Sequence, residues 1–398
     1  MDWRSFSFRY HLDTKNVLPV LVTIEAYKEA ADKLILPPDW REQLDRLNRI
    51  RAVHGTTALE GNPLSEAEVS LQMDLMSKPE ERTAPKATKE QLQIRNAGQA
   101  QSWVKLRFQA DAGHLPMRLA DIHHMYHMLT ERSDETNNLP GRFRTFSVVV
   151  GSRETGGVHR GAPYEDVPQL MDAYISFLNS PKLLAQRPVI RALLAHFFLV
   201  TIHPFGDGNG RVSRLVEAGI LFQGGYNVHG FYGLSNYFYR HEGEYKALLQ
   251  KCRQKQPFDV TPFVMFGLHG CASELKGINN FIKAKLNRVI YRSMLARSFK
   301  RKTGDRRRLL NQREYNLLDF LLDATEPLDP FSDNPSRQIK FSDLREEPYI
   351  KVAYKSVTPR TFHRELLRLG NLGFIDFKRL EGADEPIVEL NFGAIAKY

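Results

Sequence analysis

The chain has 398 residues, of which 42% are hydrophobic and 26% charged, a composition that is ordinary for a soluble globular protein with two or more domains. Its formal net charge of +10 favours anionic partners but identifies none. Only two cysteines and no long apolar stretch are present, which excludes a disulfide framework, a signal peptide and a membrane span, so we expect a cytoplasmic protein without a membrane partner.

Helical spacing of apolar residues dominates the first third of the chain. We expect helices over residues 24–36, 39–54 and 91–108. Pro37 and Pro38 end the first of them, and a charged surface loop at residues 78–89 precedes the last. Ser65 and Glu68 form a capping box for a further helix.

The stretch T-T-A-L-E-G-N-P follows the second of these helices. Thr56 and Glu60 are four residues apart, so on a helix they lie one above the other. Gly61, with the Asn-Pro that follows it, has the chemistry of a helix end. Taken alone, Glu60 is best explained as a solvated carboxylate.

The middle of the chain is also expected to be helical, over residues 114–129, 168–178 and 189–201. The last segment is apolar nearly all round, which predicts a buried central helix with His196 as a core histidine. The histidines at 123, 124 and 127 are expected on the surface or in packing, because no carboxylate or cysteine cluster accompanies them.

One hairpin interrupts the helices. Residues 146–150 are β-branched and aromatic, and glycines and a proline bound them on both sides. They predict a β-hairpin arm in an otherwise helical chain.

Residues 203–214 read H-P-F-G-D-G-N-G-R-V-S-R and concentrate chemistry in twelve positions. Gly206, Gly208 and Gly210 allow a tight turn and a close approach of the backbone to a ligand. A helix that starts near Gly210 would present free N–H groups and its positive dipole end, which together form an anion site. Arg211 and Arg214 are three apart, so on that helix they share a face and can clamp phosphate oxygens.

Two further residues of this stretch carry catalytic chemistry. Asp207 is a hard oxygen ligand for Mg²⁺, which binds through one or two carboxylates together with substrate phosphates. His203 is the one group here that can act as a base near neutral pH. The combination predicts a phosphate cradle with a base rather than a glycine-rich loop beside a core histidine.

The same stretch resembles the signature of the Fic family, H-x-F-x-[D/E]-G-N-G-R-x-x-R, at every fixed position. The resemblance implies a mainly α protein, a Fic-type helical bundle with a β-hairpin flap. It implies a protein adenylyltransferase that moves AMP from ATP to a Tyr, Thr or Ser hydroxyl of a target protein or of itself. His203 would be the base, Asp207 would hold Mg²⁺ or Mn²⁺, and the remaining phosphate ligands would be Gly206, Gly208, Asn209, Gly210, Arg211 and Arg214.

Thr56, Glu60 and Gly61 resemble the inhibitory motif of the family, [S/T]-x-x-x-E-[G/N], placed upstream of the signature in the same chain. The resemblance implies that Glu60 pairs with Arg214 and takes the place of the γ-phosphate of ATP.

The segment around residues 141–163 resembles the family's flap, which brings the target to the nucleotide. It matches at Gly141, Arg144, Val150, Gly151 and Pro163, and the resemblance implies that Val150, Gly151 and Ser152 contact the nucleotide. For the adenine pocket only Tyr245 matches, since Glu244 and Cys252 replace a tyrosine and an asparagine that are common in the family. Nucleotide preference is therefore less specified than phosphate binding.

The last third of the chain resembles a small winged-helix (α+β) domain. A basic helix is expected over residues 278–308, then helices at 311–324, 341–346 and from Thr358, and strands at 374–380 and 387–392. Arg360, Arg364 and Arg368 would lie along one face of the third helix, where a DNA reader places them. Such domains also serve in protein docking or dimerisation, so DNA and a second copy both stay open as partners.

We therefore expect four segments: a helical region at 1–110, a catalytic domain at 111–275, a linker helix at 276–308 and a winged-helix-like domain at 309–398. Two alternatives remain beside the adenylyltransferase. One is a DNA-binding regulator whose Fic domain senses nucleotide, and the other is the reverse reaction, removal of AMP with Glu60 positioning a water. Transfer of phosphate or phosphocholine on the same fold is also left open.

Overall fold

The computed structural model describes residues 3–76, 87–109, 115–132, 139–152, 157–227, 230–303, 307–327, 337–379 and 385–398. The chain divides into two compact units, the first ending at Leu275 and the second beginning at Lys276. The boundary falls inside one continuous helix, α12 (Thr261–Lys300). The helix expected to start at residue 278 is thus the second part of a longer one.

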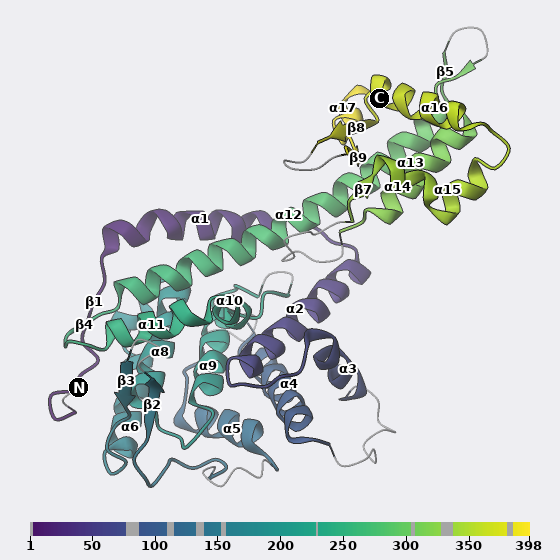
Figure 1. Cartoon of the computed structure of the whole chain (residues 1–398). Helices are drawn as coiled ribbons and strands as arrows, with labels where there is room; N and C mark the ends of the chain where they lie inside the picture. The colour runs from purple at the N-terminus through teal and green to yellow at the C-terminus, as the bar shows by residue number, and fades with distance from the viewer. Residues whose placement is uncertain are drawn as a thin grey trace. The chain divides into compact units, whose positions relative to one another are not determined.

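The first unit is mainly helical (Figure 1). Its helices are α1 (Thr14–Asp32), α2 (Pro38–Ala58), α3 (Glu66–Met76), α4 (Lys89–Arg107), α5 (Leu119–Thr130), α6 (Val167–Leu178), α7 (Pro181–Leu184), α8 (Pro188–Ile202), α9 (Asn209–Gln223), α10 (Ser235–Arg240), α11 (Glu242–Cys252) and the start of α12. Two strand pairs accompany them: β1 (Tyr10–His11) parallel to β4 (Phe258–Asp259), and β2 (Val149–Ser152) antiparallel to β3 (Gly157–Arg160).

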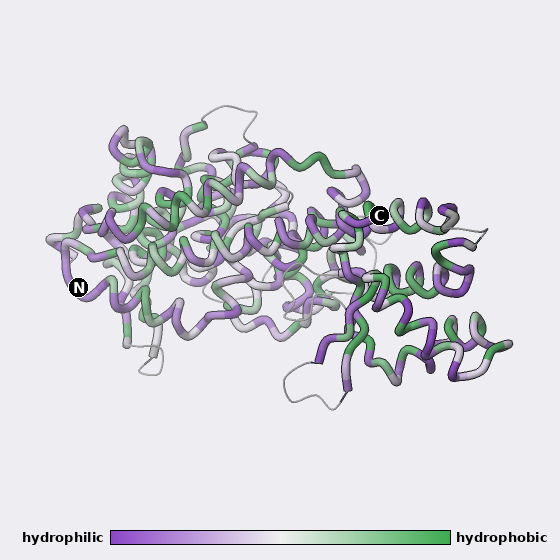
Figure 2. The backbone as a smooth tube through the Cα atoms, turned by 90° about the horizontal axis from the view of Figure 1, so that it is seen from above, coloured by the Kyte–Doolittle hydropathy of each residue, from purple (hydrophilic) through white to green (hydrophobic). Residues whose placement is uncertain are grey.

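The core of this unit is built around α8, whose residues from Val189 to Ile202 are all buried. α9 packs along it, and α6 covers another side. The expectation of a buried central helix is therefore correct. Most other helices alternate between hydrophobic and hydrophilic residues along the tube in Figure 2, which is the pattern of helices that bury one face.

Two predicted helix starts are wrong. α1 begins at Thr14, ten residues before the expected start, because the Asp13 carboxylate caps it by accepting from the N–H groups of Lys15 and Asn16 at 3.0 and 3.5 Å. α5 begins at Leu119 rather than at residue 114. The reason is the carboxylate of Asp121, which accepts the Arg118 N–H at 3.0 Å and fixes the first turn there.

The hairpin is present, but β2 begins at Val149 rather than at residue 146. The carbonyl of Phe146 accepts a 2.7 Å hydrogen bond from the Arg144 side chain, whereas the Val148 carbonyl still accepts the Gly161 N–H across the hairpin at 3.1 Å. The chain between β2 and β3, from residue 153 to residue 156, lies outside the described residues. The expected surface loop at 78–89 also lies mostly outside them.

The second unit has its own core, formed by apolar residues of every helix and of its sheet. Its remaining elements are β5 (Lys302–Thr303), β6 (Arg307–Arg308), α13 (Gln312–Ala324), β7 (Ile339–Lys340), α14 (Phe341–Glu346), α15 (Pro348–Ala353), α16 (Pro359–Leu372), β8 (Ile375–Lys378), β9 (Ile387–Leu390) and α17 (Ala394–Lys397). β7, β9 and β8 form an antiparallel sheet in that order. The prediction missed α15 and β7, and it extended α12 to residue 308, where the structure has β5 and β6 instead.

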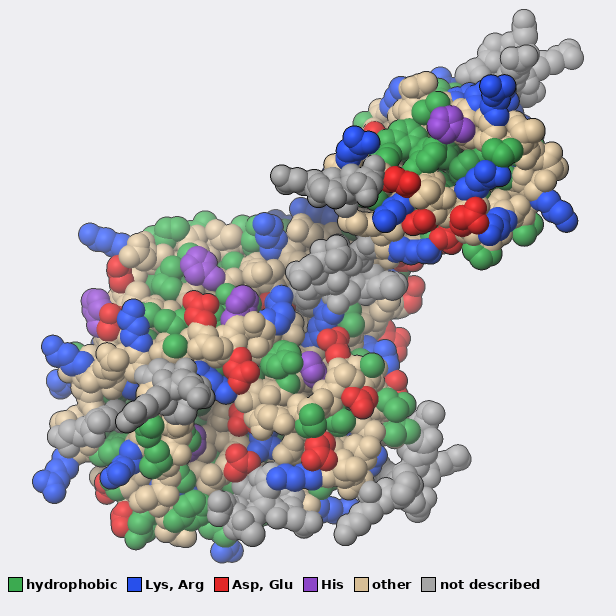
Figure 3. All heavy atoms as spheres, viewed as in Figure 1, with side chains coloured by type: hydrophobic (Ala, Val, Ile, Leu, Met, Phe, Trp, Pro, Cys, Tyr) green, Lys and Arg blue, Asp and Glu red, His purple; other side chains and the backbone are tan. Residues whose placement is uncertain are grey.

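The three arginines expected on one DNA-facing stripe of α16 are not equivalent. Arg368 donates to both carboxylate oxygens of Glu314 at 2.5 Å, and the Glu314 side chain is fully buried. All three arginines are exposed, but Arg368 is engaged in holding α16 to α13. On the face shown in Figure 3, acidic and basic side chains are interspersed rather than gathered in one basic patch. A winged-helix function for this unit stays a prediction.

None of the helices in the described ranges is long and apolar enough to cross a membrane.

Candidate active site

The turn between α8 and α9 sets the position of His203. This residue ends α8 in the left-handed region, with φ 57° and ψ 61°, and its N–H donates to the Leu199 carbonyl at 2.9 Å. A residue with a Cβ rarely adopts this conformation, and holding it there costs on the order of 1–3 kcal/mol. Gly208, at φ 75°, then turns the chain into α9, a conformation that glycine adopts without that cost.

Asn209 closes this turn from within. Its amide oxygen accepts from the Phe205 N–H and its amide nitrogen donates to the Phe205 carbonyl, both at 2.9 Å. The residue is 1% exposed. Its side chain, expected among the phosphate ligands, therefore faces the turn, and it acts on a ligand only through the backbone that it shapes.

Arg214, one turn into α9, is held by residues of the first third of the chain. Its Nη2 donates to Glu60 Oε1 at 2.6 Å and to the Thr56 carbonyl at 3.0 Å, while its Nε donates to Thr56 Oγ1 at 2.8 Å. Only 3% of the Arg214 side chain is exposed. The pair that the resemblance implied is present in the structure.

The Glu60 carboxylate is ionised in this position. Burial raises the pKa of Glu60, but the charges of Arg214 and Arg211, with the hydrogen bond from Arg214, bring the pKa below its ordinary value. Burial likewise lowers the pKa of Arg214, and Glu60 more than offsets it, so that pKa is raised. The two side chains form a true ion pair.

The pair lies against the start of α9. A Cβ added at Gly210 would lie 2.3 Å from Glu60 Oε1 and 2.9 Å from an Arg214 nitrogen, so a side chain there would displace this ion pair. A helix N-terminus attracts anions through its free N–H groups and its dipole. The Glu60 carboxylate thus occupies the place where the sequence predicted an anion site.

The end of α2 brings Glu60 to that place. α2 ends at Ala58, Gly61 follows at φ 86°, and Glu60 lies in the turn between them. α2 also approaches α10 closely at Gly55, where a Cβ would lie 2.8 Å from the Ser235 carbonyl. This close packing fixes α2, and with it the height of Glu60 above α9.

Arg211 has a different partner from Arg214. Its Nη2 donates to Asp207 Oδ2 at 2.5 Å, four residues earlier in the chain. Asp207 remains 42% exposed at its side chain, and Arg211 is almost fully buried. The two signature arginines, expected to bind phosphate oxygens, are each held by a separate carboxylate in this structure.

His203 is neutral at physiological pH. Burial, together with the charges of Arg253 and Arg144, lowers the pKa of His203 to about 4, against the opposing effects of the Val200 carbonyl and Glu60. Its Nδ1 lies 3.3 Å from the Val200 carbonyl, which fixes the ring orientation. A buried imidazole without its proton is in the form that a general base requires.

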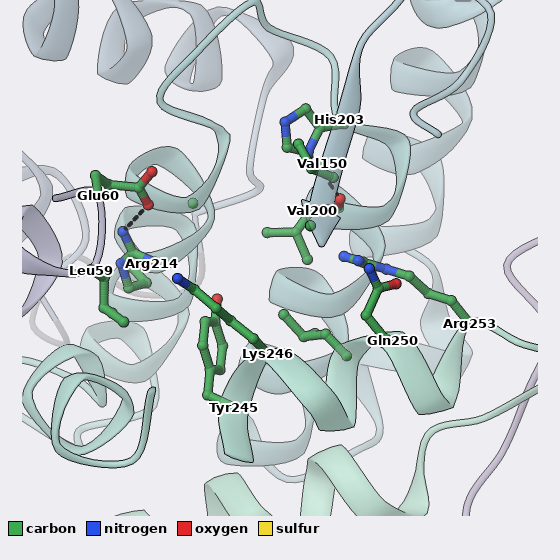
Figure 4. Close-up of a pocket in the computed structure, with 13 residues that line it drawn as sticks. Leu59, Glu60, Val150, Val200, His203, Arg214, Tyr245, Lys246, Gln250 and Arg253 are labelled. Atoms are coloured by element: carbon green, nitrogen blue, oxygen red, sulfur yellow. Dashed lines mark hydrogen bonds and ion pairs between the residues drawn. The ribbon is translucent and has the colours of Figure 1, made fainter. Parts of the chain in front are cut away.

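A cavity of about 280 Å³ joins these groups (Figure 4). Its lining includes His203, Gly210, Arg214 and Glu60, and also Val150 and Gly151 of the flap and Tyr245 of α11. Of the other predicted site residues, Thr56 accepts a hydrogen bond from Arg214, and Ser152 ends β2. The turn before α9 and the first residues of that helix, beside the cavity, contain Gly206, Asp207, Gly208, Asn209 and Arg211.

The flap is tied to this site from both ends. Arg144, 2% exposed, donates to the His203 carbonyl at 2.8 Å and to the Ala162 carbonyl at 2.5 Å. On the far side, Gln250 Nε2 donates to the Gly157 carbonyl at 2.8 Å. The flap is therefore anchored both to the turn between α8 and α9 and to α11.

Sequence reasoning missed a buried network behind Tyr245. His196 Nδ1 lies 2.7 Å from Glu217 Oε2, and His196 Nε2 lies 2.9 Å from the Tyr245 hydroxyl. The other oxygen of Glu217 accepts the Leu234 N–H at 3.1 Å. His196 is a core residue, as expected, but it also fixes a wall of the cavity. Nothing in the sequence pattern joins these residues, because they come from three different helices.

Comparison with known proteins places this geometry among relatives. Residues 116–221 match the sequence model of the Fic/DOC family. The chain is similar to "Protein adenylyltransferase Fic" of Aedes aegypti, with 36% identity over 126 residues, which are 32% of this chain and 22% of the relative. It is also similar to "Protein adenylyltransferase fic-1" of Caenorhabditis briggsae, with 34% identity over 28% of this chain and 21% of the relative. The chain thus spans about a fifth of the length of the curated relatives that it matches.

Solved structures share the fold. A Fic family protein from Desulfovibrio desulfuricans G20 superposes with a TM-score of 0.55 at 18% identity, covering 96% of this chain and 97% of that one. Fic-1 (residues 134–508) from C. elegans superposes with a TM-score of 0.53 at 21% identity, covering 68% of this chain and 74% of that one. At these identities the likeness concerns the fold alone, and it confirms the expected mainly helical, Fic-type architecture.

Proposed function

Because the chain carries a Fic/DOC domain at residues 116–221, we propose that it is a protein adenylyltransferase, which moves AMP from ATP to a hydroxyl of a protein, and that Glu60 inhibits it. The acceptor is proposed only by its chemistry, a Tyr, Thr or Ser side chain of a target protein or of this chain itself. The curated relatives, similar over about a third of this chain, support the activity. The intact set of base, carboxylate, helix N-terminus and two arginines supports the chemistry.

His203 supplies the base in this proposal. Neutral and partly buried at the cavity wall, it takes the proton of the acceptor hydroxyl. The oxygen then forms a bond to the α-phosphorus of ATP, the bond between that phosphorus and the bridging oxygen breaks, and pyrophosphate leaves with the electron pair. A base of this kind adds roughly 10²–10⁴-fold to the rate. The rest comes from positioning and charge neutralisation by the chain's cationic groups.

The start of α9 and its two arginines would hold the phosphates. Gly210 leaves room for a phosphate oxygen at the helix N-terminus, in the volume that the Glu60 carboxylate now fills. Arg214 would take up γ-phosphate charge and Arg211 β-phosphate charge. For both, the phosphate would replace a carboxylate partner, Glu60 or Asp207.

Asp207 fits a divalent cation. Its side chain is 42% exposed and offers one carboxylate at the turn before α9. Within the described ranges, no cluster of three or more His, Cys, Asp and Glu side chains could hold a metal by itself. A single carboxylate suits Mg²⁺ or Mn²⁺ bound jointly with substrate phosphates, where the ion neutralises phosphate charge.

The Arg214–Glu60 ion pair is the observation that carries the inhibitory half of this proposal. Arg214 is buried and the Glu60 side chain is 25% exposed, and Glu60 places a negative charge where the terminal phosphate of ATP would lie. ATP must displace this carboxylate or bind with its phosphates shifted, and both lower the rate of transfer.

The test uses ATP labelled in either the α- or the γ-phosphate. We expect Glu60→Gly protein, with Mg²⁺, to incorporate the α-label and not the γ-label. Incorporation of the γ-label would indicate phosphate transfer instead. Incorporation of neither label, in the presence of candidate targets, would count against the proposed activity.

A further inference from the structure

Arg253 is a cavity cation that the proposed mechanism does not use, and, unlike the cavity residue Lys246, which pairs with Glu242, it has no carboxylate partner among the described residues. It follows α11, is 9% exposed and lines the same cavity as His203. In Figure 4 its guanidinium points into the pocket on the side opposite Arg214. Its Nε donates to Thr201 Oγ1 at 3.1 Å, and the fully buried Thr201 hydroxyl in turn donates to the Phe197 carbonyl at 2.6 Å. The guanidinium is therefore held in place.

This cation has no acidic partner among the described residues, unlike the two signature arginines. Burial lowers the pKa of Arg253 to about 10, so the group stays charged at neutral pH. The C-terminal end of α8, where Thr201 lies, offsets part of the charge through its dipole. However, Thr201 engages only Nε, and the terminal nitrogens remain available to a ligand. Buried charges are ordinarily paired, which makes a ligand the natural partner here.

The position of Arg253 identifies which part of a nucleotide it meets. The phosphate site lies at Gly210 and Arg214, on one side of the cavity. Between that site and Arg253 the walls include the apolar and aromatic side chains of Tyr245, Leu249, Val150 and Val200, with Lys246 and Gln250 beside them. Flat, uncharged groups bind in such surroundings, so the base belongs there and its outer edge belongs at Arg253.

We propose that Arg253 reads the edge of the nucleobase, and that the base site accepts guanine as well as adenine. This rests on the proposed function only in placing a nucleotide in the cavity. A guanidinium donates hydrogen bonds and accepts none. Guanine presents two adjacent acceptors, O6 and N7, which match two N–H donors of the guanidinium. Adenine presents the N7 acceptor beside an amino group, which is itself a donor and cannot accept from Arg253. The substrate class becomes purine nucleoside triphosphates rather than ATP alone.

The test measures binding of GTP, ATP and inorganic tripolyphosphate, with Mg²⁺, to full-length Glu60→Gly protein by calorimetry. We expect GTP to bind at least as tightly as ATP. Adding Arg253→Met should lower the affinity for GTP by about tenfold or more, which is what the loss of a bidentate contact costs. The affinity for ATP should fall by less. Tripolyphosphate has no base, so its affinity should not change, and this also shows that the variant is folded.

Two matched variants sharpen the result. Arg253→Lys keeps the positive charge but removes the two parallel N–H donors of the guanidinium, so it should also lower the ratio of GTP to ATP affinity. Lys246→Met removes another cavity cation, one already paired with Glu242, and should leave the ratio of GTP to ATP affinity unchanged.

Three outcomes would overturn the inference. The first is binding of GTP that is more than about tenfold weaker than binding of ATP, since the two acceptors of guanine should favour GTP. The second is an equal loss of affinity for tripolyphosphate and GTP in Arg253→Met, and the third is no loss of affinity for any ligand. The first excludes guanine as a ligand, the second makes Arg253 a phosphate ligand, and the third makes it a structural cation. Failure of the proposed function is a separate result, since it would appear as nucleotide binding without transfer of AMP to protein.

Discussion

Arg214 and Glu60 are 154 residues apart in the chain, and a hydrogen bond of 2.6 Å joins them at the N-terminus of α9. Thr56, one turn before Glu60, supplies two more acceptors to the same guanidinium. Arg214, which we propose as a phosphate ligand, thus donates three hydrogen bonds to groups of its own chain. These contacts join the start of α9 to the end of α2.

Removing the Glu60 carboxylate should favour ATP over ADP. Glu60 fills the place of the terminal phosphate, which ADP lacks, so the Glu60→Gly variant should gain affinity for ATP and little for ADP. A charged hydrogen bond of this kind is worth about 1.5–3 kcal/mol, or roughly 10- to 150-fold. Calorimetric titration measures both ligands. Glu66→Gln, which alters a carboxylate on the neighbouring α3, is the control and should change neither affinity. An equal gain for ATP and ADP would mean that Glu60 does not compete with the terminal phosphate.

Thr56 should contribute to inhibition through its hydroxyl. Thr56→Val removes the acceptor for Arg214 Nε but keeps the side-chain shape, so it should raise transfer of AMP by less than Glu60→Gly does. Thr57→Val is a matched control, because the neighbouring hydroxyl donates to the Val53 carbonyl and does not contact Arg214. Rates of self-modification with labelled ATP compare the three variants. Activation by Thr57→Val to the same extent would show that loosening of α2, and not the loss of the contact, is responsible.

The pH dependence of transfer should reflect a base with a lowered pKa. His203 has a pKa of about 4 and acts in its neutral form, so the rate should not fall between about pH 8 and pH 6 and should fall as the pH approaches that value. In Glu60→Gly protein the charge of Glu60, which raises the pKa of His203, is absent, so this midpoint should not rise through that charge. Single-turnover rates at saturating ATP measure the profile, and ATP binding at each pH separates chemistry from affinity. A midpoint near the ordinary histidine value, about 6.5, would contradict the assignment.

Asn209 should matter for stability as well as for activity. Asn209→Ala leaves the buried N–H and carbonyl of Phe205 without partners, which should cost about 1–3 kcal/mol of unfolding free energy. Asn16→Ala, at an exposed position of α1, should cost less than about 0.5 kcal/mol. Urea unfolding of the full chain measures both. Equal stability of the two variants would show that the Phe205 contacts do not hold the turn.

Much of the fold could be predicted from sequence, because it depends on local patterns. The all-apolar segment of α8 and the capping box of Ser65 and Glu68 lie where expected. The early start of α1 was missed, since Asp13 caps a helix whose first turns carry Pro19 and little amphipathic pattern. Local chemistry therefore predicts helices better than it predicts their ends.

The candidate site was predictable only in part. The signature residues are consecutive, so their chemistry can be inferred from spacing. The partnership of Glu60 with Arg214 came from resemblance to a family, because nothing in the spacing of two residues so far apart brings them together. Arg253 and the pair of His196 and Glu217 gave no signal, since burial and tertiary contacts alone give them their roles.

The most direct test of the account is the intact mass of wild type, Glu60→Gly and Glu60→Gly/His203→Ala after incubation with ATP and Mg²⁺. The account predicts little or no change for wild type, a gain of one or more AMP groups for Glu60→Gly, and loss of that gain in the double variant. An AMP gain that is equal in wild type and Glu60→Gly would contradict inhibition by the Arg214–Glu60 pair. An AMP gain that survives His203→Ala would contradict the assignment of the base.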